Sequence, residues 1–154
     1  MTPPEVVEAL RRRGWTVATG ESLTAGRVAA TLADVPGCSD VLRGGIVAYQ
    51  PDIKVGLLGV PADVASQGVV TAAVAEAMAR GAQVALRADV GIATTGVAGP
   101  DAHAGEPVGS VWIAVATPFG TASRHLSLSG DREAIRSATV QACWSLLGSL
   151  LHEH

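Results

Sequence analysis

One serine, one tyrosine and one lysine have the side chains that nucleophilic catalysis requires. Ser22 lies in the stretch 19–27, where an apolar run ends and a small-residue pattern typical of a helix begins. Tyr49 is the only tyrosine of the chain, and Lys54, its only lysine, follows a few positions later. A serine hydroxyl attacks a carbonyl carbon when a nearby base takes its proton, and a desolvated lysine or a tyrosinate can be that base. Because strand ends and helix starts share one edge of an α/β sheet, both residues could reach Ser22.

Each of these three residues also has a purely structural interpretation. Ser22 would be a good N-cap for a helix over 23–33, Lys54 a solvated helix residue and Tyr49 a half-buried strand residue. A Ser-His-Asp triad is poorly supported, because the sequence has no G-x-S-x-G motif and its histidines lie at positions 103, 125, 152 and 154. The residue types by themselves therefore leave a catalytic role and a structural role open.

Two further stretches could bind an anion. Residues 94–101 read Thr-Thr-Gly-Val-Ala-Gly-Pro-Asp and follow a buried apolar run, so backbone N–H groups there could face an oxyanion. This stretch is not a P-loop, because no Gly-Lys-Ser/Thr follows it. Arg132 and Arg136 share one face of a helix, and their guanidinium groups suit a phosphate. Pairing of either arginine with Asp131 or Glu133 is the structural alternative.

The elements that must position these residues are strands alternating with helices, followed by a late hairpin. Hydrophobic periodicity and capping residues predict helices over 3–13, 23–33, 71–87 and 131–151, and a short helix that carries Lys54. Strands are expected over 15–19, 41–49, 89–95, 108–116 and 121–128, with Gly44-Gly45 marking a bulge or a close backbone approach. This order predicts an α/β fold, a mixed sheet covered by helices on both faces.

The composition bounds the class of protein. The 154 residues suggest a single domain over 1–154, and a chain with 48% hydrophobic and 16% charged residues is expected to fold around a core. A net charge of −3 argues against nucleic acid as a partner. No stretch predicts a membrane span or a signal peptide. Cys38 and Cys143 suit neither a disulfide scaffold nor a metal site, so we expect no metal and a cytoplasmic location.

Five short motifs follow one another along the chain. They are Glu-Ser-Leu-Thr at 21–24 with Gly26, Gly-Ile-Val-Ala-Tyr at 45–49 followed by Lys54, Thr-Gly-Val-Ala-Gly-Pro-Asp at 95–101, Pro-Val-Gly-Ser-Val-Trp at 107–112, and Gly-Asp-Arg at 130–132 with Arg136. In this order they resemble the C-terminal domain family of CinA, the competence/damage-inducible proteins, which includes nicotinamide-nucleotide amidohydrolases. The resemblance runs from about Trp15 to Leu147 and covers nearly the whole chain.

The resemblance implies a three-layer α/β/α sandwich, with a mixed sheet of about five strands, that acts in pyridine-nucleotide (NAD) salvage. Its reaction would be hydrolysis of the carboxamide of nicotinamide mononucleotide to nicotinic acid mononucleotide and ammonia. It implies Ser22 as the nucleophile, with Tyr49 and Lys54 as activating partners, and leaves open which of the two is the base. It implies no metal and no organic cofactor, and it implies a homo-oligomer. Many relatives carry an additional N-terminal domain, and the resemblance implies that this chain is the stand-alone form of the C-terminal one. The motif residues predicted to bind substrate are Glu21, Thr24, Gly26, Thr95, Gly96, Gly99, Asp101, Arg132 and Arg136.

This sequence departs from the family's usual motifs at several positions. Ala25 stands where relatives carry a glycine, and Ala102 and His103 stand where they often carry a glycine pair. These changes spare the three candidate catalytic side chains, so they bear on substrate preference and turnover more than on mechanism. They motivate two alternatives, a catalytically weak nucleotide-binding or regulatory module and an amidase for another small carboxamide.

Overall fold

A five-stranded mixed sheet forms the centre of the computed structural model, which describes residues 1–153 and leaves His154 outside them. Its strands are β1 (Val17–Glu21), β2 (Leu42–Val47), β3 (Val90–Gly96), β4 (Ser110–Thr117) and β5 (Gly120–Ser127). They lie in the order β2-β1-β3-β4-β5, with β1 parallel to both β2 and β3. β4 runs antiparallel to β3 and forms a hairpin with β5. The predicted mixed sheet is therefore confirmed.

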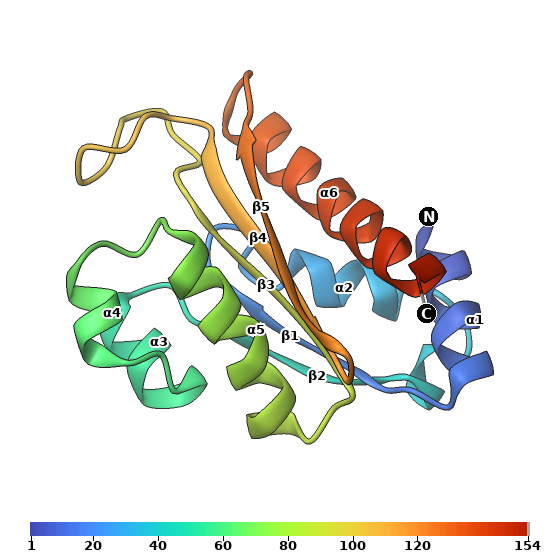
Figure 1. The fold of residues 1–154 in the computed structure, drawn as a ribbon. Coiled ribbons are helices and arrows are strands. Elements are labelled where there is room, and N and C mark those ends of the chain that lie inside the picture. Colours follow the sequence, from blue (N-terminus) through green and yellow to red (C-terminus); the bar gives the residue numbers. More distant parts are fainter. Residues whose placement is uncertain (154) are drawn as a thin grey trace.

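Helices cover both faces of this sheet, as Figure 1 shows. One face carries α1 (Pro3–Arg13), α2 (Arg27–Ala33) and α6 (Arg132–Glu153). The other face carries α3 (Pro51–Leu58), α4 (Ala62–Ser66) and α5 (Ala72–Leu86), and a 3₁₀ turn, η1 (Cys38–Asp40), precedes β2. The three layers form the predicted α/β/α sandwich. Within residues 1–153, no helix has the length and apolar character needed to cross a lipid bilayer.

The two faces of the sheet are packed with side chains of different size. On the α6 face, large residues such as Trp144, Leu147 and Ile113 are fully buried, and the removal of their apolar surface from water stabilises the fold. On the α5 face the buried residues are mostly alanines, and a Cβ on Gly91 of β3 would collide with the carbonyl oxygen of Ala79 in α5. Helix α5 therefore lies very close to the sheet, which makes the centre of the molecule a rigid platform.

The start of α2 differs from the prediction. A helix is predicted over 23–33, with an N-cap role as one of two interpretations of Ser22, but α2 begins at Arg27 and Gly26 occupies the N-cap position. Ala25 and Gly26 have φ values of +48° and +93°, which a right-handed helix cannot contain. The side chain of Glu21, rather than that of Ser22, accepts hydrogen bonds from N–H groups in the first turn of the helix. Ser22 is consequently free of the capping role.

Smaller differences concern where elements begin and end. Strand β1 begins and ends two residues later than the predicted 15–19, and α4 was not predicted. A capping box formed by Thr2 and Glu5 begins α1, and the irregularity predicted at the Gly44-Gly45 pair is confirmed. The β1–β2 register shifts there, and a Cβ on Gly45 would collide with the hydroxyl of Thr19. The glycine pair thus lets β2 lie directly against the buried strand β1.

The carboxyl ends of the three parallel strands lie at one edge of the sheet. Glu21 ends β1, Val47 ends β2 and Gly96 ends β3. Ser22, Tyr49 and the loop 97–109 follow these ends directly, and Figure 1 shows that loop extending beyond the sheet between β3 and β4. Ligand sites in open α/β sheets form at this edge, so the topology brings the candidate residues together.

Candidate active site

Ser22 and Lys54 form a buried pair at this edge of the sheet. The ammonium of Lys54 donates a hydrogen bond of 3.0 Å to Oγ of Ser22. It also donates bonds of 2.9 Å to the carbonyl oxygens of Ala48 and Tyr49, which fix its position at the start of α3. The exposed fractions are 7% for Ser22 and 1% for Lys54. A lysine so completely buried is rare without a specific partner.

Burial changes the acid–base chemistry of this lysine. Desolvation lowers the pKa of Lys54 to about 8, because removal from water disfavours the charged form. None of the carboxylates in the described part of the chain forms an ion pair with Lys54 that would oppose this effect. At pH 7 about a tenth of Lys54 is therefore uncharged, far more than for a lysine in water. In that form its Nζ can accept the proton of the Ser22 hydroxyl.

Ser22 and Lys54 open into a cavity of about 330 Å³. One wall comes from Ser22 and Leu23, a second from residues 49–54, and a third from residues 95–103 of the loop between β3 and β4. The predicted site residues that line it are Ser22, Tyr49, Lys54, Thr95, Gly96, Gly99, Asp101 and Arg132. The structure thus brings most of the predicted catalytic and substrate-binding residues to one cavity. His103 and Ala102, where the sequence departs from its relatives, line the same cavity.

Tyr49 lies at the mouth of the cavity rather than against the serine. Its side chain is 50% exposed, and its hydroxyl accepts a 2.9 Å bond from the guanidinium of Arg132. Arg132 also donates a 2.6 Å bond to the carbonyl oxygen of Gly99 in the opposite wall. Arg132 therefore connects the two sides of the cavity mouth through two uncharged groups, the hydroxyl of Tyr49 and the carbonyl of Gly99. It has no ion pair within residues 1–153, so neither Asp131 nor Glu133 neutralises its charge.

Glu21, Thr24 and Gly26 are not among the residues that line the cavity, and the side chains of Glu21 and Thr24 point away from it. The fully buried carboxylate of Glu21 accepts hydrogen bonds from the hydroxyls of Thr19 and Thr24, at 2.9 and 2.6 Å. It also accepts bonds from two backbone N–H groups of α2, at 2.8 and 3.1 Å. Glu21 therefore connects the end of β1 to the start of α2. It holds the intervening turn, residues 22–26, in place.

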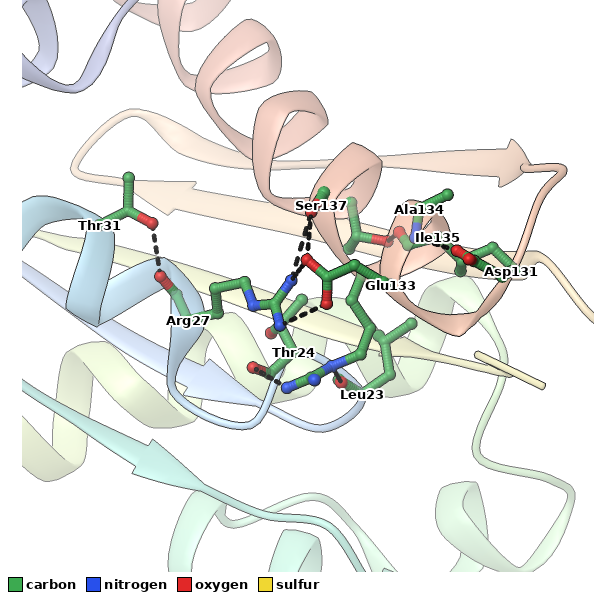
Figure 2. Close-up of polar contacts among 11 residues, drawn as sticks. Leu23, Thr24, Arg27, Thr31, Asp131, Glu133, Ala134, Ile135 and Ser137 are labelled. Carbon is green, nitrogen blue, oxygen red and sulfur yellow. Dashed lines mark hydrogen bonds and ion pairs between the residues drawn. The ribbon is translucent and has the colours of Figure 1, made fainter. Parts of the chain in front are cut away.

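Arg136 likewise faces the turn 22–26 and not the cavity. Its Nε and Nη2 donate bonds of 2.8 and 3.1 Å to the carbonyl oxygens of Leu23 and Thr24. Its predicted contact with a substrate phosphate is therefore not supported by its position. In Figure 2, Glu133 is paired instead with Arg27, whose guanidinium also reaches Ser137. Of the two arginines predicted for a phosphate, the structure brings one, Arg132, to the cavity.

Thr94, which begins the predicted stretch 94–101, has a contact that the sequence analysis did not predict. Its carbonyl oxygen accepts a 3.0 Å bond from the N–H of Ser22, and its hydroxyl lies 2.8 Å from that of Thr24. These contacts follow from the β1–β3 register, in which Thr94 pairs with Glu21. The two threonines at the end of this strand are visible in the sequence, but the register that brings Thr94 to Ser22 is not.

The fold and the cavity together define an α/β/α protein with a serine–lysine pair at the carboxyl edge of its parallel strands. The sequence narrows this class further. The model of the CinA C-terminal domain matches residues 2–151, and the chain belongs to that family.

Relatives of known sequence and structure agree with this assignment. The chain is 48% identical over 130 residues to a competence-damage inducible protein of Desulforamulus reducens, a match that covers 84% of this chain and 32% of that protein. It is 43% identical over 147 residues to a CinA-like protein of Frankia casuarinae, covering 95% and 34% of the two chains. A CinA superfamily protein from Klebsiella pneumoniae has the same fold, with a TM-score of 0.95, 30% identity and coverage of 99% and 96%. The chain thus spans about a third of the length of these curated relatives.

Proposed function

We propose that this protein is an amidohydrolase that converts nicotinamide mononucleotide to nicotinic acid mononucleotide and ammonia, with Ser22 as the nucleophile. The observation that carries the proposal is the 3.0 Å hydrogen bond between Nζ of a buried lysine and the hydroxyl of Ser22. A serine that only fills space or caps a helix has no need of such a partner. A nucleophile does, because its hydroxyl is weakly reactive until a base removes its proton.

In the first step, uncharged Lys54 takes the hydroxyl proton while Oγ of Ser22 attacks the carboxamide carbon. The carbonyl oxygen becomes an oxyanion, which needs hydrogen-bond donors that are already in place. The backbone N–H groups of Leu23 and Thr24 follow Ser22 directly and have no hydrogen-bond partner among residues 1–153. We assign the oxyanion to this pair of donors.

In the second step, the tetrahedral intermediate collapses and the C–N bond breaks. Protonated Lys54 returns its proton to the leaving nitrogen, so that ammonia departs and an ester to Ser22 remains. Water then attacks this ester, with Lys54 again taking a proton, and releases the carboxylic acid. Lys54 is the base in this account because its Nζ contacts Ser22, whereas the hydroxyl of Tyr49 is bonded to Arg132.

The character of the cavity supports a small aromatic amide with an anionic group. Leu23, Val69, Val70 and Val97 supply apolar lining for a pyridine ring. Arg132 lies at the rim without an ion-pair partner in the described structure, and a guanidinium with spare donors suits a phosphate. The phosphate would then lie at the mouth and the carboxamide at the buried end.

A coupled ammonia assay tests the proposal. Wild-type protein and Ser22→Ala would be incubated with nicotinamide mononucleotide, nicotinamide riboside, nicotinamide and unrelated small carboxamides. We expect ammonia release from the mononucleotide by the wild type and none above background by Ser22→Ala, whose circular dichroism should match the wild type. Full activity in Ser22→Ala would contradict the proposal. Ser66→Ala, in a short exposed helix, is the matched control that should stay active.

The same panel separates the alternatives that the departures at Ala25, Ala102 and His103 raise. Faster ammonia release from another carboxamide would redefine the substrate and leave the serine mechanism intact. Calorimetric binding of the mononucleotide with no ammonia from any amide would make the protein a binding or regulatory module. We also propose that the protein is a cytoplasmic homo-oligomer, and light scattering after size exclusion would test its oligomeric state.

A further inference from the structure

Arg136 has an arrangement of hydrogen bonds that neither phosphate binding nor simple packing explains. It is partly buried, lies on α6, and forms no ion pair with any described carboxylate. Its two side-chain hydrogen bonds within the described residues go to the carbonyl oxygens of Leu23 and Thr24, in the turn directly after Ser22. A guanidinium charge is thus placed on the far side of the turn from the proposed oxyanion.

The first of these bonds acts on the N–H of Thr24. A peptide unit is planar, and it joins the carbonyl of one residue to the N–H of the next, pointing in opposite directions. The carbonyl of Leu23, which accepts from Nε of Arg136 at 2.8 Å, belongs to the same unit as the N–H of Thr24. A cation on the oxygen end polarises the unit and strengthens the N–H as a donor. That N–H is one of the two groups left without a partner in the described structure.

The second bond reaches the N–H of Leu23 through one more peptide unit. The carbonyl of Thr24 accepts from Nη2 of Arg136 at 3.1 Å and shares its unit with the N–H of Ala25. The N–H of Ala25 in turn donates a 3.0 Å bond to the carbonyl of Ser22. That carbonyl shares its unit with the N–H of Leu23, the second group without a partner. Both chains of polarised peptides therefore begin at Arg136 and end at a free donor beside the nucleophile.

We propose that Arg136 is a positioning residue for the oxyanion site, and that it orients and polarises the N–H groups of Leu23 and Thr24 instead of binding substrate. The inference rests on the proposed acyl transfer at Ser22. The physical reason is that hydrogen-bond donors fixed before the reaction stabilise the developing negative charge, and the protein does not have to reorganise during the reaction. Removing Arg136 should leave substrate binding largely unchanged and weaken the stabilisation of the transition state.

Arg27 provides a matched control on the same surface. Its guanidinium donates to Glu133 at 2.8 and 3.0 Å and to Ser137 at 3.3 Å, so it connects the start of α2 to α6 next to the turn that Arg136 contacts (Figure 2). Its side chain forms no hydrogen bond to the carbonyls of Leu23 and Thr24 within residues 1–153. Arg27→Met therefore removes an arginine beside the same turn and leaves the bonds from Arg136 to the turn in place.

A fluorophosphonate reagent probes the oxyanion site without reference to the natural substrate. Oγ of Ser22 forms a bond to phosphorus, fluoride leaves, and Lys54 takes the hydroxyl proton, while the phosphoryl oxygen occupies the oxyanion site. The second-order rate constant for labelling, measured by intact-protein mass spectrometry, would be compared for wild type, Arg136→Met, Arg136→Lys and Arg27→Met. Thermal unfolding of each variant would accompany the rates.

We expect Arg136→Met to be labelled about 10- to 100-fold more slowly than wild type, Arg27→Met at about the wild-type rate, and Arg136→Lys at an intermediate rate. With nicotinamide mononucleotide, Arg136→Met should lose kcat and keep its KM. If Arg136→Met fails to fold, slower labelling of folded Arg136→Lys supports the proposal and wild-type labelling of it overturns the proposal.

Two other results would overturn the inference in distinguishable ways. In the first, Arg136→Met is labelled at the wild-type rate, and its KM is raised for the mononucleotide but unchanged for the riboside. Arg136 would then bind the phosphate. That result would leave Ser22 as the nucleophile. Absence of labelling at Ser22 in the wild-type protein would instead remove the proposed function and the inference together.

Discussion

The cavity has two walls that are built in opposite ways. The turn 22–26 begins with three buried residues, and side chains from β1, β3 and α6 hold it by hydrogen bonds. The loop 97–109 is exposed from Pro100 to Gly105 and is tied mainly at its base. One of its few long-range contacts is the bond from Arg132 to Gly99.

Under the proposed function, this contrast assigns bond making to the turn 22–26 and recognition of the rest of the substrate to the loop 97–109. Bond making requires reacting groups held within a fraction of an ångström, and the buried turn provides that fixed geometry. Recognition of the rest of a substrate tolerates adjustment and is usually carried by exposed loops on a rigid scaffold. Consistent with this division, Ala102 and His103, which depart from the usual family motif, lie on the exposed wall.

Removal of the base should have the largest effect. Lys54→Met is expected to lower kcat about 10³-fold, because an uncharged side chain of similar length cannot take the Ser22 proton. Tyr49→Phe, which keeps the backbone carbonyl that holds Lys54, should lower kcat less than about tenfold. The measurement is ammonia release from nicotinamide mononucleotide. A larger loss in Tyr49→Phe than in Lys54→Met would make the tyrosine the base and contradict the division between the walls.

The pH dependence should follow the buried wall. Since burial lowers the pKa of Lys54 to about 8, protonated Lys54 predominates below that pH and cannot act as base. The value of kcat/KM should therefore rise about tenfold per pH unit below about 8 and level off above it. The same profile is expected in Arg132→Gln, because that residue belongs to the rim. A profile that stays flat between about pH 6 and 9 would exclude Lys54 as the titrating base.

A change at the rim should affect binding rather than chemistry. Arg132→Gln is expected to raise KM for the mononucleotide about 10- to 150-fold, as hydrogen bonds to a charged group contribute about 1.5–3 kcal/mol. Its kcat should stay within about threefold of wild type. Nicotinamide riboside, which has no phosphate, is the control substrate whose KM should not change. An equal rise in KM for both substrates would show that Arg132 shapes the cavity without binding phosphate.

The smallest effect is expected at Ala25, the exposed end of the buried turn. Its φ of +48° costs an alanine about 1–2 kcal/mol, part of which glycine's greater freedom in the unfolded chain offsets. Ala25→Gly should therefore stabilise the fold by about 0.5 kcal/mol, measured by denaturant unfolding. Ala30→Gly, on exposed helical backbone of α2, should destabilise it by about 1 kcal/mol. Destabilisation by both changes would mean that the turn is not strained.

The sequence was sufficient for the sheet, for its covering helices and for several residues that the structure brings to one cavity. Ser22, Lys54 and Arg132 were predicted from residue type, and a lone lysine five residues after a lone tyrosine stands out in any chain. The hydrophobic periods of strands and helices are equally visible in the sequence, and they predicted the three layers. These successful predictions used only residue type and spacing along the chain.

The sequence was insufficient wherever a role depends on direction. Glu21, Thr24 and Arg136 were predicted to bind substrate, and the structure instead shows their side chains bonded within or to the turn 22–26. The start of α2 was predicted too early, because small residues suit a helix and nothing in the sequence shows that Ala25 has a positive φ. The side-chain contacts could not be predicted because hydrogen-bond partners such as Thr94 depend on strand register.

Trapping of the acyl-enzyme tests the central claim most directly. Hydroxylamine would be added during turnover of nicotinamide mononucleotide, so that its nitrogen attacks the ester carbonyl and displaces Oγ of Ser22. The account predicts that the wild type forms the hydroxamate of the nucleotide together with ammonia, and that Ser22→Ala forms neither. Ammonia released with no hydroxamate at any hydroxylamine concentration, or released by Ser22→Ala, would contradict it.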